Sequence, residues 1–242
     1  MQLQIYPDHS SQSLAAAELI LSAIRQKPDA VLCLATGDTP RLAYNLLVEK
    51  ALKEKLNLSE CFFIGLDEWL GIPRDNEGSC HHFLHKLVFQ PLGINSNKVH
   101  LFDSMTPDPV KDCNQMNQVI AGKGGIDLML VGVGMNGHLG FNEPGVSPDL
   151  QAHIITLDET TRTVGQKYFQ QTTPLNQGIT LGLQQILQSR QLLMMASGLK
   201  KSNIVKQALE GPVSATVPAS YIQVHANGIA LLDEAAATLI AG

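Results

Sequence analysis

Short apolar runs alternate with stretches of helical periodicity along the chain. The apolar runs are rich in Val, Leu and Ile and are too short for independent helices, which is typical of parallel strands buried on both faces. Predicted strands cover residues 3–6, 30–35, 61–66, 99–102, 126–133, 153–157, 191–196 and 228–232, with a further apolar stretch over 178–183. Predicted helices cover 11–26, 42–55, 79–89, 109–120, 160–169 and 197–210. This alternation predicts an α/β fold, a three-layer αβα sandwich around a modified Rossmann-like, mostly parallel sheet.

Polar residues mark where two of these helices begin. Serines before the helix over 11–26 are suited to capping its free amides. In the segment 36–40, Thr39 is expected to be the N-cap of the next helix, with Pro40 at its first position. The unpaired amides of such a junction lie at the positive end of the helix dipole, so this loop is a candidate anion site.

The stretch from 126 to 145, IDLMLVGVGMNGHLGFNEPG, organises the rest of the chain. Its apolar first half predicts a buried strand, and the glycines and proline that follow predict an irregular loop. The loop carries Asn136, His138, Asn142 and Glu143 where the strand ends, which is the edge at which ligands bind in open α/β sheets. An imidazole five residues from a carboxylate is suited to acid/base chemistry, because the carboxylate can orient the ring and stabilise its charged form.

Two other interpretations fit parts of this loop. Residues 132–137 match the dinucleotide fingerprint GxGxxG, and Asp158 follows at about the spacing of a ribose-binding acid. The fingerprint requires a helix to open at its third glycine, which the later glycines and Pro144 disfavour. Nicotinamide binding is therefore disfavoured, whereas a glycine-rich turn with a solvated histidine remains an alternative.

Polar residues also follow two other predicted strands, so that three segments, 36–40, 67–69 and 134–143, share this character. In a parallel sheet these segments emerge at one edge, and Asp67, His138 and Glu143 are therefore expected to converge. Asp67 alone would more often be a helix cap or a structural acid. The convergence, more than any single residue, predicts a catalytic site.

Two further signals are weaker. Lys201 near the start of a helix opposes the dipole and is usually solvated, but beside a bound phosphate the same position supplies a needed charge. His81 and His85 share a helical face, which suggests zinc. The acid of an HExxH motif is missing between them and no second ligand cluster follows. A polar helix face without metal is therefore the preferred interpretation.

The bulk composition limits the class of protein. The chain has 242 residues, 44% of them hydrophobic and 16% charged, which is enough to bury a full core in one domain. A net charge of −5 argues against a general nucleic-acid surface, so an anionic ligand needs a local cationic cluster. Four cysteines without a CxxC pair suggest reduced thiols and a cytoplasmic protein. The amino-terminal residues lack a signal-peptide pattern, and no apolar run approaches the roughly 18 residues of a membrane span.

Together these segments resemble the glucosamine-6-phosphate deaminase (isomerase) family, in its short bacterial form. The resemblance rests on ATGDTP at 35–40, GLDEWLGIP at 65–73, GVGMNGHLGFNEPG at 132–145 and SGLKK at 197–201, in the expected order over nearly the whole chain. FNEPG is the specific part, because the related 6-phosphogluconolactonases lack it. The resemblance implies a hydrolase of amino-sugar catabolism that converts glucosamine 6-phosphate and water to fructose 6-phosphate and ammonia, without metal or organic cofactor.

The resemblance also implies roles for single residues. Asp67 would be the enolisation base, and His138, supported by Asn136 and Glu143, would open the sugar ring. A lid within 150–175 would gate the site. The substrate phosphate would be bound by Gly37, Asp38, Thr39, Lys167 and Lys201.

The chain departs from the family pattern at three of these positions. Lys167 stands where members have Arg, which keeps the charge but loses the bidentate fork. Asp38 stands where many members have Ser, and we expect its side chain to turn outward so that only backbone amides touch the phosphate. Asn136 stands where many members have Asp, which leaves Glu143 as the only carboxylate partner of His138 within the motif.

The chain ends soon after its last predicted strand, as in shorter members without allosteric regulation, so a monomer or small homo-oligomer is expected. Two rival functions remain open, a sugar-phosphate lactonase on the same fold and a non-catalytic sugar-phosphate sensor. A lactonase needs no proton transfer at C2 of the sugar, so hydrogen exchange with deuterated water separates it from a deaminase. A sensor would bind glucosamine 6-phosphate without releasing ammonia.

Overall fold

The computed structural model describes residues 1–241 and has the predicted α/β architecture. Its main sheet consists of β1 (Gln2–Tyr6), β2 (Val31–Leu34), β3 (Phe62–Gly65), β5 (Val99–His100), β6 (Leu128–Gly132), β9 (Gln191–Ala196) and β10 (Gly228–Asp233). The seven strands lie in the order β1-β10-β9-β6-β2-β3-β5, and each neighbouring pair is parallel. The predicted main strands and their parallel arrangement are thus confirmed.

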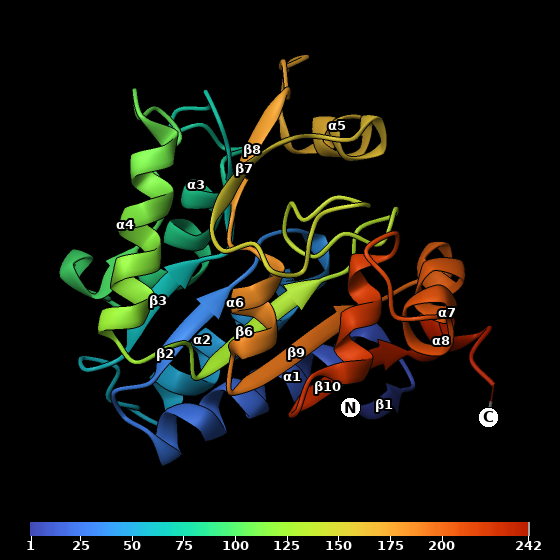
Figure 1. The fold of residues 1–242 in the computed structure, drawn as a ribbon. Helices are drawn as coiled ribbons and strands as arrows, with labels where there is room; N and C mark the ends of the chain where they lie inside the picture. Colours follow the sequence, from blue (N-terminus) through green and yellow to red (C-terminus); the bar gives the residue numbers. More distant parts are fainter. Residues whose placement is uncertain (242) are drawn as a thin grey trace.

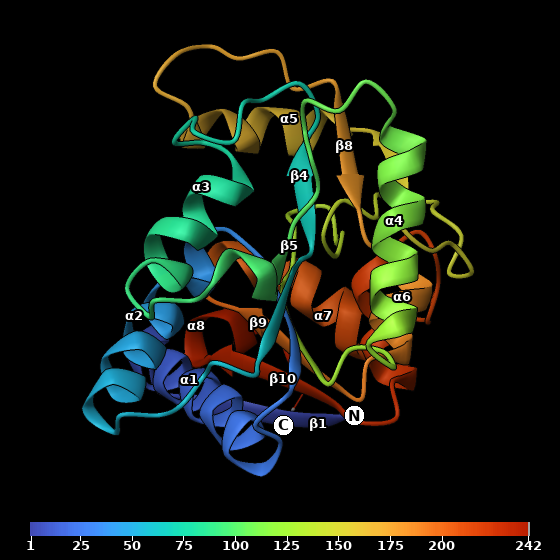
Figure 2. The same ribbon diagram turned by 90° about the vertical axis from the view of Figure 1, so that its left-hand side faces the viewer.

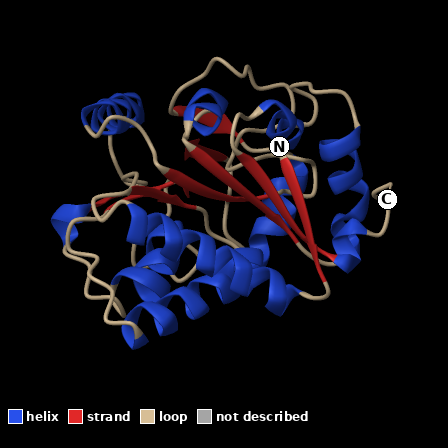
Figure 3. Ribbon diagram, turned by 90° about the horizontal axis from the view of Figure 1, so that it is seen from below, coloured by secondary structure: helices blue, strands red, loops and turns tan. Residues whose placement is uncertain are grey.

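Helices cover both faces of this sheet and complete the three layers (Figure 3). One face packs against α1 (His9–Gln26), α2 (Asp38–Lys53), α3 (Cys80–Leu84) and the π-helical turn η1 (His85–Phe89). The other face packs against α4 (Pro109–Gly122), α6 (Leu183–Gln188), α7 (Ser202–Glu210), the 3₁₀ turn η5 (Pro218–Val224) and α8 (Glu234–Ala237). The helix predicted over 79–89 is therefore an α-helical turn followed by a π-helical one.

The apolar runs become strands because they bury side chains on both faces. In β2, Val31 and Cys33 enter the core beneath α4 and α7, whereas Leu32 and Leu34 enter the core beneath α1 and α2. All four are buried. Successive side chains of a strand point to opposite faces, so a strand between two helical layers must be apolar at every position.

The order of the strands places a crevice beside β2. From β2 the chain continues to β3 on one side and later enters β6 on the other side of β2. The loops that follow β2 and β6 therefore leave the same edge of the sheet in divergent directions. Such a switch point is where α/β sheets bind ligands.

A second, antiparallel sheet stands over this edge and was not predicted. It consists of β4 (Asp67–Trp69), β8 (Gln177–Thr180) and β7 (His153–Thr156), in the order β4-β8-β7. With α5 (Glu159–Gly165) it lies above the main sheet in Figure 1, and Figure 2 shows the same arrangement from the side. Residues 67–69 are thus a strand rather than a loop, because Asp67 pairs with Thr180, far away in the sequence.

Two expected helix starts were wrong. The α1 N-cap is Asp8, whose carboxylate accepts a hydrogen bond from the Ser11 amide at 2.7 Å, so an acid and not a serine caps this helix. Helix α2 begins at Asp38 with Gly37 as N-cap, so Thr39 already lies inside the helix. Gly37 has φ of 121°, a conformation that only glycine adopts without strain. The N-cap therefore lies at Gly37, two residues before the expected Thr39.

The remaining bulk expectations concern thiols and membranes. Cys33, Cys61, Cys80 and Cys113 are all free and buried. Within residues 1–241, no helix combines the length and the apolar character that crossing a membrane requires.

Candidate active site

A cavity of about 560 Å³ lies at the carboxyl edge of the main sheet, within the size range of small-molecule sites. Its walls come from the loops after β2 and β6, from β4, and from α5 with the 3₁₀ turn η3 (Gln166–Tyr168). Glu143 is 5% exposed and lies against the His138 ring, just outside the lining. The other eight expected site residues line the cavity: Gly37, Asp38, Thr39, Asp67, Asn136, His138, Lys167 and Lys201.

Asp67 begins β4 and presents a half-buried carboxyl group to the cavity. Burial, with a smaller contribution from the neighbouring Glu68 charge, raises the pKa of Asp67 to about 7. The Cys80 thiol donates to Asp67 Oδ1 at 3.6 Å and weakly opposes this rise in pKa. A carboxyl group with such a pKa can release or accept a proton near neutral pH.

Glu68 has a different task from its neighbour. Its buried carboxylate accepts backbone hydrogen bonds from Trp69 at 2.9 Å, Cys80 at 2.9 Å and His81 at 2.8 Å. The last two amides belong to the first turn of α3, whose free amides need acceptors. Glu68 therefore ties α3 to β4 and fixes Cys80 beside Asp67.

His138 is placed by the glycine-rich loop after β6. A Cβ atom on Gly134 would lie 2.3 Å from the His138 ring, so only glycine leaves room for the imidazole there. His138 Nδ1 lies 3.3 Å from Glu143 Oε2, and the His138 amide donates to Asn136 Oδ1 at 3.3 Å. The loop contains no helix, which contradicts the dinucleotide interpretation of GxGxxG.

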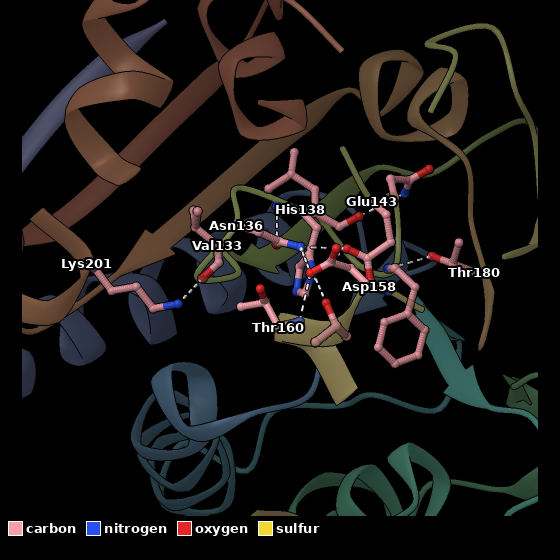
Figure 4. A network of polar contacts seen from close by, with 12 residues as sticks. Val133, Asn136, His138, Glu143, Asp158, Thr160, Thr180 and Lys201 are labelled. Atoms are coloured by element: carbon pink, nitrogen blue, oxygen red, sulfur yellow. Dashed lines mark hydrogen bonds and ion pairs between the residues drawn. The ribbon is translucent and has the colours of Figure 1, made fainter. Parts of the chain in front are cut away.

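Glu143 is held as a carboxylate. Its burial alone would raise its pKa, but hydrogen bonds from His138, Thr161 and Asn136 outweigh burial, and the pKa of Glu143 is lowered. Asn136 Nδ2 donates to Glu143 Oε2 at 2.8 Å, and the Asp158 amide donates to Oε1 at 3.2 Å. Figure 4 shows Asn136, His138, Glu143 and Asp158 gathered in this network.

The expected phosphate site consists of a helix N-terminus and two lysines. Helix α2 opens at Asp38 directly beside the cavity, so its first amides point toward a ligand there. The Asp38 carboxylate is exposed and pairs with Lys167 Nζ at 2.6 Å. This pair links the first residue of α2 to η3, and both residues line the cavity.

Lys201 supplies a second, more buried cation. It follows the Gly198 turn at the start of α7, and Nζ donates to the Val133 carbonyl at 2.5 Å (Figure 4). Burial, with repulsion from Lys167, lowers the pKa of Lys201 to about 8. A phosphate dianion between the two lysines would relieve both effects, because it supplies the missing counter-charge.

The structure also places the residues of the alternative interpretations. Asp158 is the N-cap of α5 and accepts from the Thr160 amide at 2.8 Å, which explains its position without a ribose. The His81 and His85 rings stack with centroids 6.2 Å apart. Among residues 1–241, no cluster of three or more His, Cys, Asp or Glu side chains is arranged to hold a metal ion.

Two residues that contact the expected site residues were not predicted from the sequence. Thr161 on α5 lies with Oγ1 3.0 Å from His138 Nδ1, and Cys80 on α3 contacts Asp67. Both belong to helices that the sequence predicts, but the antiparallel sheet, which includes β4 beside α3 and β7 before α5, gives no sequence pattern of its own. One signal was available: the DEW segment at 67–69, which ends in an apolar residue, is compatible with a strand and so with the second sheet.

The fold and the site define an α/β protein with carboxyl groups, an imidazole and two lysines gathered at one cavity. The model of the glucosamine-6-phosphate isomerases/6-phosphogluconolactonase family matches residues 8–231. The chain belongs to this family.

Known relatives within the family are similar over nearly their whole length. AgaI of Escherichia coli (strain K12), provisionally named a deaminase, is 40% identical over 96% of this chain and 91% of its own. The glucosamine-6-phosphate deaminase of Rhodopirellula baltica is 37% identical over 99% of this chain and 96% of its own. The solved structure of a monomeric glucosamine-6-phosphate deaminase superposes with a TM-score of 0.96, at 33% identity, over 99% of this chain and all of that one.

Proposed function

We propose that this protein converts glucosamine 6-phosphate and water to fructose 6-phosphate and ammonia. The observation that carries the proposal is a pair of carboxyl groups, Asp67 and Glu143, whose pKa values are shifted in opposite directions at one cavity. Such a pair suits a reaction that needs both a proton carrier and a fixed negative charge. The likeness to glucosamine-6-phosphate deaminases over nearly the whole chain supports the choice of substrate.

Ring opening is assigned to His138. The closed sugar opens when a base removes the proton of the C1 hydroxyl and an acid protonates the ring oxygen. An imidazole can do both in turn, because it carries a proton on either nitrogen. Glu143 supports the charged ring electrostatically, and Asn136 orients Glu143 through the hydrogen bond at 2.8 Å. The open chain then carries an aldehyde at C1 and the amine at C2.

Proton transfer along the open chain is assigned to Asp67. Its carboxylate removes the proton from C2 while the C1 oxygen takes a proton from water, which gives an enolamine, and the resulting acid returns a proton to the C1 carbon. This leaves an imine at C2, which adds water and breaks down to the ketone and ammonia. A pKa of about 7 matches this role, because the group must take up and release the proton at similar cost.

The phosphate is assigned to the part of the cavity that is lined by Lys167 and Lys201. In this proposal the amides of Gly37, Asp38 and Thr39 face the phosphate, and Lys167 and Lys201 supply its counter-charge. The Asp38 carboxylate, paired with Lys167 at 2.6 Å, then stays outside the phosphate position. Binding shifts Lys167 from its carboxylate partner toward the more highly charged phosphate.

We further propose a monomeric, cytoplasmic protein of one domain with a lid within 150–175. The likeness to a monomeric deaminase supports the assembly state. Four free, buried cysteines suit a reducing compartment. Strand β7, helix α5 and η3 form the proposed lid, and residues of α5 and η3 line the cavity.

Ammonia release from glucosamine 6-phosphate by the purified protein tests the proposal. We expect turnover by the wild type and a drop of about 10² to 10⁴-fold for Asp67→Asn, because general acid/base assistance is lost. Deuterium from solvent should appear at C1 of the product to the extent that the Asp67 carboxyl group exchanges its proton with solvent before returning it. Binding of the sugar phosphate without ammonia release would favour a sensor, and turnover of a phosphorylated lactone instead would favour a lactonase.

A further inference from the structure

Thr161 reaches His138 from a different element than the other residues of the network. It lies on α5, is 5% exposed, and places Oγ1 3.0 Å from His138 Nδ1. The Glu143 carboxylate oxygen is further from the same nitrogen, at 3.3 Å. The nearest partner of the His138 ring is therefore a hydroxyl group on the proposed lid and not the carboxylate of its own loop.

The carboxylate is occupied by other donors. Asn136 Nδ2 contacts Glu143 Oε2 at 2.8 Å, and the Asp158 amide contacts Oε1 at 3.2 Å. The hydroxyl of Thr161 also hydrogen-bonds to Glu143 and contributes to its lowered pKa. A hydroxyl group donates one hydrogen and accepts others, so it can join the ring to the carboxylate.

We propose that Thr161 is a positioning residue that holds His138 in the tautomer protonated at Nδ1, and that it does so only while α5 is docked. The ring N–H donates to Thr161 Oγ1, and the Thr161 O–H donates to Glu143. Nε2 is then left with a free lone pair, ready to accept the proton of the C1 hydroxyl. This inference rests on the proposed function, in which His138 opens the ring.

Docking of the lid and readiness of the base are coupled by this contact. The first turn of α5 holds Glu143 through the Asp158 amide and His138 through Thr161. The turn after α5 holds the opposite wall, where Lys167 pairs with Asp38. A lid that lifts removes the nearest Nδ1 partner, so ring opening is confined to the closed state.

Other charges near the ring are accounted for. Glu143 and Asp158 are the carboxylates within the network, and Arg162 lies beside Asp158 on α5. Across the cavity, Asp67 and Lys201 line the same space. None of these groups offers a neutral hydroxyl to Nδ1, which distinguishes the contact made by Thr161.

The test compares Thr161→Val, which removes only the hydroxyl function at nearly constant volume, with Thr161→Ser, which keeps it. Thr163→Val, at an exposed position of the same helix, is the matched control. The first readout is the ¹⁵N spectrum of labelled histidine without substrate, with the His138 signals assigned through His138→Gln. We expect the Nδ1-protonated tautomer in the wild type, in Thr161→Ser and in Thr163→Val, and a mixture of tautomers in Thr161→Val.

The second readout is the steady-state rate of ammonia release. We expect kcat/KM to fall about tenfold in Thr161→Val, mainly through kcat, because one buried hydrogen bond to the base is lost. Thr161→Ser should recover most of that loss. If Thr161→Val does not fold, Thr161→Ala against Thr161→Ser makes the same comparison of hydroxyl absent against hydroxyl present.

An unchanged tautomer in the folded variant without a hydroxyl overturns the proposal, as does an equal loss of rate in Thr161→Ser. A wild type that releases no ammonia, but whose tautomer still responds to Thr161→Val, defeats the proposed function and leaves the positioning role intact. The two failures are therefore distinguishable.

Discussion

Asp67 and Glu143 lie at one cavity, yet the surroundings of Asp67 raise the pKa of its carboxyl group and those of Glu143 lower it. Both lie in densely packed walls, where burial raises the pKa of a carboxyl group. Within residues 1–241, the Asp67 carboxylate receives its one side-chain hydrogen bond from a weak donor, the Cys80 thiol. Glu143 receives hydrogen bonds from Asn136 and the Asp158 amide, and its Oε2 also lies 3.3 Å from His138 Nδ1. The number and strength of the donors, and not burial, decide which carboxyl group stays charged.

The opposite pKa shifts suit Asp67 and Glu143 to different chemical roles. A group with a pKa of about 7 exchanges protons near neutral pH, and a group with a lowered pKa remains a fixed negative charge. Asp67 is therefore suited to carry the proton, and Glu143 to support an imidazolium. The difference also predicts opposite effects on stability when either charge is removed.

Asp67→Asn should stabilise the folded protein above neutral pH. Because the pKa of Asp67 is raised, the folded protein favours the protonated side chain. The stability that this preference provides is fully present below pH 3.8, the pKa of the unfolded chain, and is lost as the pH rises through about 7. Replacing the carboxylate removes that loss, by about 4 kcal/mol as an upper bound, since one pKa unit corresponds to about 1.4 kcal/mol. Urea unfolding near pH 8 measures the gain, which should shrink as pH falls toward about 4.

The exposed Asp149→Asn is the control for this measurement, since that carboxylate is solvated. A folded protein that becomes less stable through Asp67→Asn near pH 8 would mean that the Asp67 charge is well supported, and the contrast with Glu143 would disappear. A gain in stability together with lost turnover would instead identify a residue kept for function at a cost in stability.

Glu143→Gln should have the opposite sign. The lowered pKa of Glu143 contributes stability that is present above its unfolded pKa and is lost as pH falls through the folded value. Loss of hydrogen bonds to a charged acceptor should destabilise the protein by about 1.5–3 kcal/mol near pH 8, with a smaller loss in acid. The same unfolding experiment measures it, beside Glu159→Gln at an exposed position of α5. Equal stability of Glu143→Gln and wild type near pH 8 would contradict the account of Glu143.

The two sides also differ in how far the sequence predicted them. His138 and Glu143 lie five residues apart in one glycine-rich loop after a buried strand, a local pattern that shows both the edge of the sheet and the chemistry. Main-sheet strands such as β2 were predictable for the same reason, because burial on both faces makes every residue apolar. The proximity of His138 and Glu143 and their place at the sheet edge were thus predictable from local spacing.

The surroundings of Asp67 were not available in this way. Its strand β4 pairs with β8, more than a hundred residues away, and Cys80 reaches it through the capping of α3 by Glu68. Thr161 depends on the same antiparallel sheet. Short strands and one-to-one polar contacts between distant segments leave no periodicity in a sequence, because periodicity reports burial of a face and not the identity of a partner.

Cys80 makes a small contribution to the pKa of Asp67. Its Sγ receives a hydrogen bond from Thr36 Oγ1 at 3.1 Å and donates to Asp67 Oδ1 at 3.6 Å, which lowers the pKa of Asp67 slightly. Thr36 thereby orients the thiol hydrogen toward the carboxylate. The charge of Glu68 acts in the opposite direction and raises the pKa of Asp67.

Cys80→Ala should therefore raise the pKa of Asp67 further. Because the base acts as a carboxylate, kcat/KM rises with pH through that pKa, and the acidic limb of the profile should move to higher pH. Loss of one weak hydrogen bond limits the shift to at most about one pH unit. Cys80→Ser, with a stronger donor, should return the limb to the wild-type position or below it, and Cys113→Ala, on the buried face of α4, should leave it unchanged. A limb that moves to lower pH in Cys80→Ala would show that the thiol does not support the carboxylate, and the weak-donor side of the comparison would need another explanation.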